Sequence, residues 1–155
     1  MKRIRENRAP LLAGVLLFAA VLLLLFAPIR TRLVKGDVSI EVPYLAFLHN
    51  PDVYRSPGHS RYVWVQRESK YDGFEAFAAL REKEKQRSDE NAWSYTEWES
   101  DASEAFGVCW SAGSPRTVDA YLCSKATGRV WSLEFWSFTD KQIAESMASV
   151  ELLSE

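Results

Sequence analysis

Strand-like patterning is densest in residues 92–137, AWSYTEWESDASEAFGVCWSAGSPRTVDAYLCSKATGRVWSLEFWS. Four runs in this stretch are rich in aromatic and β-branched residues, and short connections with turn-forming Gly, Ser, Pro or Thr separate them. Connections of this length join antiparallel neighbours, so the stretch predicts an antiparallel meander. Its strands are expected at residues 92–98, 104–111, 117–124 and 129–137.

Two further strands are expected upstream of the meander. Residues 38–42, VSIEV, and residues 61–67, RYVWVQR, alternate side chains with the period of two that is typical of a strand. Residues 44–60 lie between them and contain Asn-Pro and Ser-Pro-Gly, which are turn formers. We therefore expect a long, turn-rich loop at residues 44–60.

Two helices are predicted to pack on this sheet. The first begins with a capping box at Asp72 and carries an apolar stripe at Phe74, Phe77 and Leu80. Beyond Leu80 the ten residues REKEKQRSDE carry both signs of charge at neighbouring helical positions. That pattern is typical of a solvated helix end.

The closing helix has the clearest local signal in the domain. Thr139 and Gln142 have the spacing of a capping box, and Phe138 and Ile143 that of a hydrophobic staple. Residues 150–153 then fit a short terminal strand. The order of elements predicts an α+β fold, an antiparallel sheet packed with two helices.

This order of elements resembles that of the PsbP, Mog1 and DcrB-like group of small domains. The resemblance covers residues 37–155 and includes the strings IEVP at residues 40–43 and ESMASV at residues 145–150. It implies a fold alone, because members of that group serve unrelated roles as accessory and binding proteins. It transfers no functional residue to this chain.

An apolar segment precedes the domain. Residues 9–29, APLLAGVLLFAAVLLLLFAPI, contain no charge and are long enough as a helix to cross a hydrocarbon core of about 30 Å. We expect an uncleaved transmembrane signal anchor. A cleaved signal peptide is the alternative, but its apolar core is about 7 to 15 residues long and ends at a small-x-small site, which is missing here.

The flanking charges predict how the anchor is oriented. Four basic residues precede the apolar segment and three follow it, and the N-terminal tail is very short. This favours a single-pass protein of the inner or plasma membrane with a cytoplasmic N-terminus, although a cytoplasmic domain on the same anchor is the alternative. The expected division is a basic stub at residues 1–8, the anchor at 9–29, a linker at 30–36 and a periplasmic or extracellular domain at 37–155.

Charge is distributed unevenly along the chain. Residues 1–36 carry seven Lys or Arg and one Glu, a net charge of +6, whereas residues 37–155 carry twelve Lys or Arg and twenty Asp or Glu, a net charge of −8. An acidic domain repels the phosphates of nucleic acid, which argues against nucleic acid as a partner. Basic partners or metal cations are the ligands that the charge favours.

Two cysteines lie in adjacent predicted strands. Cys109 and Cys123 would lie directly opposite each other if the connection were a longer loop centred on Arg116, and an external domain would be in an oxidising compartment. A tight turn centred on residues 113–116 would place them several residues out of step. We expect a disulfide, with two buried free thiols as the alternative.

Two groups of residues are candidates for binding a partner. The acidic run Glu97, Glu99, Asp101 and Glu104 would form an anionic strand edge that captures a basic protein. The alternatives are a solvated edge that discourages aggregation and a calcium site, although the glycine-bearing loop of an EF-hand is absent. The second group is apolar and comprises Tyr44, Leu45, Phe47 and Leu48. It either packs beneath the loop or forms an exposed patch for a partner or a membrane.

No recognised motif indicates catalysis, a cofactor or a metal. His49, His59 and Asp52 lie near one another in sequence but lack the spacing of a metal site, and no GxSxG elbow is present. We therefore expect no enzyme but a membrane-anchored extracytoplasmic protein-binding module. An immunity or inhibitor protein against an envelope-acting toxin is one form of it; the alternatives are an accessory subunit of a membrane or envelope complex, and an enzyme without a recognisable motif.

Overall fold

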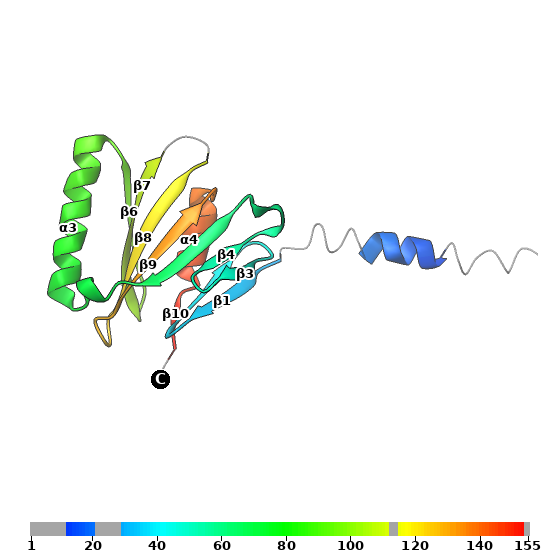
Figure 1. Ribbon diagram of the computed structural model, residues 1–155, viewed down its shortest axis with the longest axis horizontal. Helices are drawn as coiled ribbons and strands as arrows, with labels where there is room; N and C mark the ends of the chain where they lie inside the picture. The colour runs from blue at the N-terminus through cyan, green and yellow to red at the C-terminus, as the bar shows by residue number, and fades with distance from the viewer. Residues whose placement is uncertain (1–11, 21–28, 112–114, 154–155) are drawn as a thin grey trace, which may run out of the picture.

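The computed structural model describes residues 12–20, 29–111 and 115–153. From Thr31 onward it folds into two antiparallel sheets packed with two α-helices, which confirms the α+β class (Figure 1). The elements are β1 Thr31–Lys35, β2 Val38–Val42, β3 Phe47–Asn50, β4 Val53–Arg55, η1 Pro57–His59, β5 Tyr62–Arg67, η2 Ser69–Tyr71, α3 Phe74–Asn91, β6 Ser94–Glu99, β7 Ser103–Ser111, β8 Thr117–Ser124, β9 Val130–Trp136, α4 Asp140–Ala148 and β10 Glu151–Leu152.

The larger sheet has seven strands in the order β3-β4-β5-β9-β8-β7-β6. Strands β6 to β9 form the predicted meander, each pairing antiparallel with the next along the chain. Strand β5 then pairs with β9, so β9 lies between a strand from each half of the chain. The smaller sheet has the order β1-β2-β10, and β10 confirms the expected terminal strand.

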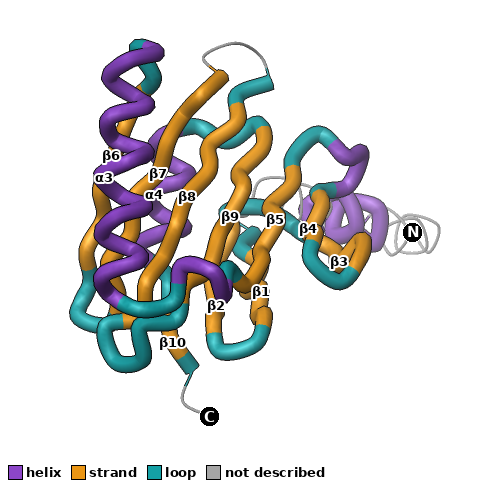
Figure 2. Tube along the Cα trace, turned by 60° about the vertical axis from the view of Figure 1, so that its left-hand side comes forward, coloured by secondary structure: helices purple, strands orange, loops and turns teal. Residues whose placement is uncertain are grey.

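The two faces of the larger sheet are covered by different layers (Figure 2). The inner face packs against α4 and the smaller sheet, and the outer face carries α3, which contacts β6 and β7. Alternation along the strands sends consecutive side chains into separate cores. The inner core includes Ile40, Val42, Val63, Val65, Ala120, Leu133, Phe135, Ile143 and Met147; the outer core comprises Phe77, Leu80, Phe106, Val108, Cys123 and Val130.

Helix α4 begins as its sequence predicts. The Thr139 hydroxyl accepts a hydrogen bond from the Gln142 backbone N–H at 3.3 Å, and the Gln142 side chain accepts one from the Thr139 N–H at 3.0 Å. Phe138 and Ile143 are both buried in the inner core. The capping box therefore fixes the start of α4, and its apolar side lies on the sheet.

Helix α3 begins differently from the prediction. Its N-cap is Gly73, without a side-chain cap, and Phe74 is 58% exposed rather than part of the buried stripe. The Asp72 carboxylate instead accepts hydrogen bonds from the Arg67 guanidinium and the Val130 N–H. Residues distant in sequence thus form hydrogen bonds with the Asp72 carboxylate, which would otherwise have capped the helix. The hydrogen bonds from the Arg67 guanidinium hold the pKa of Asp72 below its usual range.

Two segments expected to lack regular structure form strands. Residues 44–60 contain the β3–β4 hairpin, whose turn is built by the Asn50 side chain, which accepts hydrogen bonds from the Asp52 and Val53 N–H groups. Residues 30–36, expected to be a linker, contain β1, which pairs with β2 across a two-residue turn. Gly36 has φ +58° there, the left-handed conformation that such a turn requires.

The expected disulfide between Cys109 and Cys123 is wrong. Cys109 pairs with Val118 and Cys123 with Glu104, so the β7–β8 register is close to that of a tight turn. Val118 and Cys123 are five positions apart on one strand and point to opposite faces. Cys109 is buried in the inner core and Cys123 in the outer core, and both thiols are free.

The predicted anchor falls largely outside the described residues. Of residues 9–29, the structure describes 12–20, which are helical with exposed side chains, and residue 29. Within the part of the chain that the structure describes, no helix is long and apolar enough to cross a membrane. The transmembrane assignment therefore stays a prediction.

Replacing Gly107 by Ala should destabilise the protein. An added Cβ would lie 2.6 Å from the Trp98 ring, which packs over this glycine at the inner core. We expect Gly107→Ala to lower the free energy of unfolding by about 1–3 kcal/mol in urea titrations. The loss should shrink in a Trp98→Leu background, because the clashing ring is gone; an undiminished loss would contradict this packing.

Thiol titration tests the cysteine assignment. Denatured, unreduced protein should react with two equivalents of a thiol reagent, because both cysteines are free. The native protein should react slowly, since Cys109 and Cys123 are 7% and 2% exposed. Reaction only after addition of a reductant would show that the two sulfur atoms are bonded.

Candidate functional site

Helix α3 leaves part of the outer face of the large sheet open. The open part lies over β5, β9 and β8 (Figure 2), and strand β7, which carries Trp110, adjoins it. Directly opposed pairs place Trp64 beside Glu134, Glu134 beside Asp119, and Tyr62 beside Trp136. We call this surface the carboxylate–aromatic face; it consists of Tyr62, Trp64, Trp110, Asp119, Glu134 and Trp136.

The centre of this face is a pair of carboxylates from adjacent strands. Trp110 Nε1 donates a hydrogen bond to Asp119 Oδ2 at 3.0 Å, and the Tyr62 hydroxyl donates one to Glu134 Oε1 at 2.6 Å. Burial, and then the negative charge of Glu134, raise the pKa of Asp119 to about 6. Near neutral pH the pair is therefore an anionic centre whose proton uptake begins well above the usual range for Asp.

Aromatic rings surround the carboxylates. The rings of Tyr62 and Trp136 stack with centroids 5.4 Å apart, and the Arg55 guanidinium lies 5.7 Å from the Tyr62 centroid. Trp64 and Trp110 are 40% and 45% exposed, a large fraction for tryptophan. Exposed aromatic rings beside partly buried charge are typical of residues that contribute most to binding.

Hollows adjoin the face on both sides. Towards α3, a pocket of about 350 Å³ is lined by Glu84, Arg87, Trp93, Val108, Trp110, Asp119 and Tyr121. Towards the β3–β4 hairpin, a shallower one of about 500 Å³ is lined by Asn50, Pro51, Asp52, Val53, Arg55, Tyr62 and Trp64. An extended ligand could thus cross the face from one hollow to the other.

Buried charge also lines the α3 pocket. Glu84 is 8% exposed and lies 3.6 Å from Arg87, whose guanidinium is 5.0 Å from the Trp93 centroid. Glu84 adds to the negative charge that Asp119 experiences, and Arg87 opposes it. Among the residues that the structure describes, no group of three or more His, Cys, Asp or Glu is arranged to hold a metal ion.

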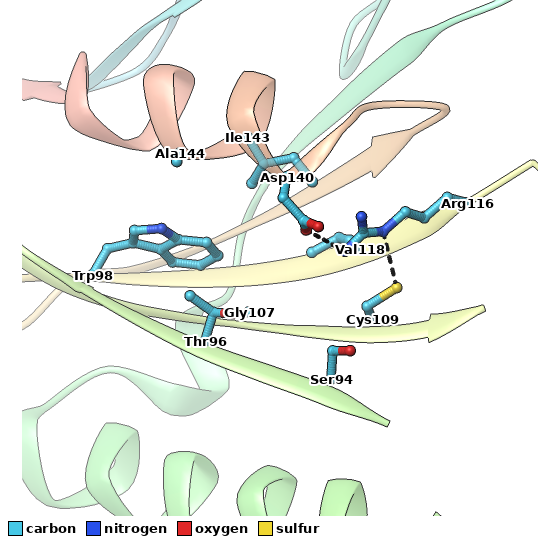
Figure 3. A pocket seen from close by; sticks show the side chains of 10 residues that line it. All are labelled: Ser94, Thr96, Trp98, Gly107, Cys109, Arg116, Val118, Asp140, Ile143 and Ala144. Atoms are coloured by element: carbon cyan, nitrogen blue, oxygen red, sulfur yellow. Dashed lines mark hydrogen bonds and ion pairs between the residues drawn. The ribbon is translucent and has the colours of Figure 1, made fainter. Parts of the chain in front are cut away.

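A smaller pocket of about 160 Å³ lies on the inner face, between α4 and strands β6 to β8 (Figure 3). Arg116 Nε donates to Cys109 Sγ at 3.2 Å, and the same guanidinium is paired with Asp140 in the first turn of α4. Trp98 lies at the other end of the pocket. Because its charged groups already neutralise each other, this pocket ties β8 to α4 and offers little to a charged ligand.

The structure brings the predicted acidic residues together on the β6–β7 hairpin but neutralises half of them. Glu99 lies directly opposite Glu104. Lys125 Nζ lies 2.7 Å from Glu99, and Arg81 lies 3.4 Å from Glu104. Glu97 and Asp101 form no ion pair with any residue that the structure describes, and Glu97 accepts a hydrogen bond from the neighbouring Tyr95 hydroxyl.

The predicted apolar group divides between core and surface. Tyr44 is 9% exposed and packs edge-on against Phe138, with centroids 5.4 Å apart. Phe47 and Leu48 on β3 are 56% and 62% exposed. The rings of His49 and His59 are 5.6 Å apart, whereas Asp52 pairs with Lys35 rather than with either histidine.

Neither Asp119 nor Glu134 was identified as a candidate from the sequence. A usable signal was present, because Asp is depleted in strands and Asp119 is central in the run TVDAYLCS. The pairing of β8 with β9 places Asp119 opposite Glu134. This pairing is part of the tertiary structure and is not visible in the local sequence of either strand. Only the register turns two isolated acids into one centre.

The pH dependence of stability tests the Asp119 environment. Its pKa is higher in the fold (about 6) than its ordinary value of 3.8, so the folded state binds the proton more tightly and stability falls as pH rises from about 4 to 6. Asp119→Asn should remove this fall and raise the free energy of unfolding at pH 8 by about 1–2 kcal/mol.

Urea titrations of the variant between pH 4 and 8 provide the measurement. Asp101→Asn, at an exposed bend, is the matched control and should keep the pH dependence of the parent protein. An Asp119→Asn variant with the parent's pH dependence would show that Asp119 has an ordinary pKa.

Comparisons with known proteins leave the function to be argued from this geometry. No family model matches the chain, and no curated protein matches it in sequence. The resemblance to PsbP, Mog1 and DcrB-like domains therefore stays one of element order. No residue of the carboxylate–aromatic face inherits a role from a relative.

Proposed function

We propose that this protein is a membrane-anchored binding module that holds a basic segment of a protein partner on its carboxylate–aromatic face. The observation that carries the proposal is the Asp119–Glu134 pair, directly opposed on β8 and β9 and set among exposed aromatic rings. A Lys or Arg side chain between the two carboxylates would relieve their mutual repulsion. Only a cation gains binding free energy by relieving this repulsion.

The surrounding rings suit the same ligand. Trp64, Trp110 and the stacked Tyr62–Trp136 pair present flat apolar area to the stem of a Lys or Arg side chain, and their faces attract its charge. Their exposed area has no covering element in the described domain. An aromatic surface around a central charge pair is typical of a protein-binding hot spot.

Binding is favoured over catalysis because the two carboxylates lack an organised reaction partner. Their hydrogen-bond donors are the Trp110 indole and the Tyr62 hydroxyl, both of which hold them in place. Burial and Glu134 raise the pKa of the Tyr62 hydroxyl far above its usual range, so it stays a donor at physiological pH. The site thus presents fixed acceptors for a cation.

The proposal includes the anchor and its orientation. Residues 9–29 would cross the membrane with the N-terminus in the cytoplasm, placing the acidic domain in the periplasm or outside the cell. An immunity or inhibitor protein would then meet an envelope-acting toxin there, and an accessory subunit would meet a neighbouring envelope protein. Recovery of one stoichiometric soluble partner in an affinity pull-down supports the first role. Recovery of a multi-subunit membrane complex supports the second.

Partner capture with matched variants tests the proposal. Full-length protein in detergent should retain a partner that Asp119→Asn/Glu134→Gln loses. The control Glu97→Gln/Asp101→Asn changes net charge equally but alters the predicted acidic edge instead, and should retain the partner. If the control variant lost the partner and Asp119→Asn/Glu134→Gln retained it, the binding site would lie on the β6–β7 hairpin, and the proposal would be contradicted.

Binding of a tetra-arginine peptide should depend on pH. Because the pKa of Asp119 is about 6, the carboxylate is largely protonated at pH 5, and affinity measured by calorimetry should fall by up to about tenfold between pH 7 and 5. Asp119→Asn should bind the peptide weakly at both pH values. A pH-independent affinity in the parent protein would contradict a role for Asp119.

A further inference from the structure

We propose that the exposed apolar side chains around strand β3 rest on the lipid bilayer into which the chain is anchored, an inference that rests on the anchor proposed above. We call this surface the β3 patch; it comprises Val34, Leu45, Phe47 and Leu48, which are 49%, 41%, 56% and 62% exposed. Strand β3 is an edge strand of the large sheet, and all four of its residues are exposed. Nothing within the described domain covers it.

The chain's own connectivity places this patch beside the membrane. The apolar segment ends at Ile29, and β1 begins at Thr31, only two residues later. Two extended residues span at most about 7 Å. The first residue of the folded domain is therefore held within about 7 Å of the end of a membrane span, whatever path the chain takes.

The Thr31 side chain is hydrogen-bonded directly to the segment that carries Leu45 and Phe47 of the patch. Its hydroxyl donates a hydrogen bond to the Tyr44 carbonyl at 2.7 Å and accepts one from the Ala46 N–H at 2.9 Å. Leu45 lies between these two residues, and Phe47 follows them. Because the Tyr44 ring is fixed in the inner core against Phe138, this segment cannot swing away from Thr31.

Strand β4 connects the remaining members. Tyr54 lies opposite Leu48, and its hydroxyl donates a hydrogen bond to the Val34 carbonyl at 3.0 Å. Val34 itself belongs to β1, three residues after Thr31. The patch therefore gathers around the point where the chain enters the domain, and Figure 1 shows β1, β3 and β4 on the same side of the molecule, away from α3.

The distribution of charge along the chain supports the same orientation towards the membrane. Residues 30–61, which contain β1, β3 and β4, carry five Lys or Arg and three Asp or Glu, a net charge of +2. Residues 62–155 carry ten Lys or Arg and seventeen Asp or Glu, a net charge of −7. A segment with exposed apolar side chains and a net positive charge fits a bilayer interface with anionic headgroups better than the acidic remainder does.

Fluorescence quenching in vesicles of phosphatidylcholine and phosphatidylglycerol tests the inference. A polarity-sensitive dye attached to the full chain at His49→Cys, on β3, reports on the patch while leaving Phe47 and Leu48 in place. The same dye at Lys85→Cys, on the exposed side of α3, is the matched control. Cys109 and Cys123 are buried and should compete little for the dye.

Lipids spin-labelled near the headgroup should quench the His49→Cys dye several-fold more strongly than the Lys85→Cys dye. Adding Phe47→Ser/Leu48→Ser should remove most of this difference without unfolding the domain, because both side chains are exposed. Equal quenching at the two positions would overturn the inference. So would a blue shift at His49→Cys that depends on the protein-to-lipid ratio, since a second copy would then cover β3.

Vesicle flotation after a urea wash separates this inference from the anchor itself. Protein that floats but shows no selective quenching leaves the anchor intact and overturns the β3 patch alone. Protein that fails to float contradicts the anchor of the proposed function, and with it the premise of the inference.

Discussion

The alternation of side chains along β7, β8 and β9 is the constraint on which the rest of the structure depends. Phe106 and Phe135 are both fully buried, yet they lie in different cores on opposite faces of one sheet. A slip of one residue in any of these strands would exchange the faces. On β8 it would carry Asp119 to the inner face, among the apolar side chains of the inner core.

The same alternation produces a like-charge conflict that differs from the opposed Glu99 and Glu104, which pair with Lys125 and Arg81. Asp119 and Glu134 are directly opposed, and like charges in that position destabilise a sheet. The donors Trp110 and Tyr62 offset part of this cost, and burial, followed by the charge of Glu134, keeps the pKa of Asp119 raised. Local conflicts in a consistent fold are expected where a protein binds or reacts, which is why this pair outweighs the more numerous acids of the β6–β7 hairpin.

Sequence patterns predicted the parts of the fold that depend on local chemistry. The meander and the capping box at Thr139 follow from alternation and from cap spacing, both of which are properties of neighbouring residues. The start of α3 was mispredicted because Arg67 and Val130, distant in sequence, take the Asp72 carboxylate. Tertiary contacts of this kind leave no signal in a local window.

Neither the β3–β4 hairpin nor the candidate site could be predicted from the sequence, for related reasons. The Asn50-Pro51 turn signal was visible, but strands of four and three residues are too short for alternation to stand out. The Cys109–Cys123 pairing failed because register depends on turn length, and an error of a few residues moves a side chain to another face. The position of Asp119 opposite Glu134 depends in the same way on the register of β8 against β9.

The geometry of the sheet relates the two surfaces that the structure leaves open. Neighbouring strands lie about 4.8 Å apart, and β3 is separated from β9 by β4 and β5, so Glu134 lies about 15 Å across the sheet from the β3 edge. If β3 rests on the bilayer, a partner on the carboxylate–aromatic face binds within about 20 Å of the lipid surface. The basic segment proposed as its ligand would be attracted to an anionic bilayer as well, and both attractions would concentrate it in the same thin layer. The acidic pair then has to compete with lipid headgroups for the same cation, and the aromatic rings around it supply the selectivity that charge alone lacks.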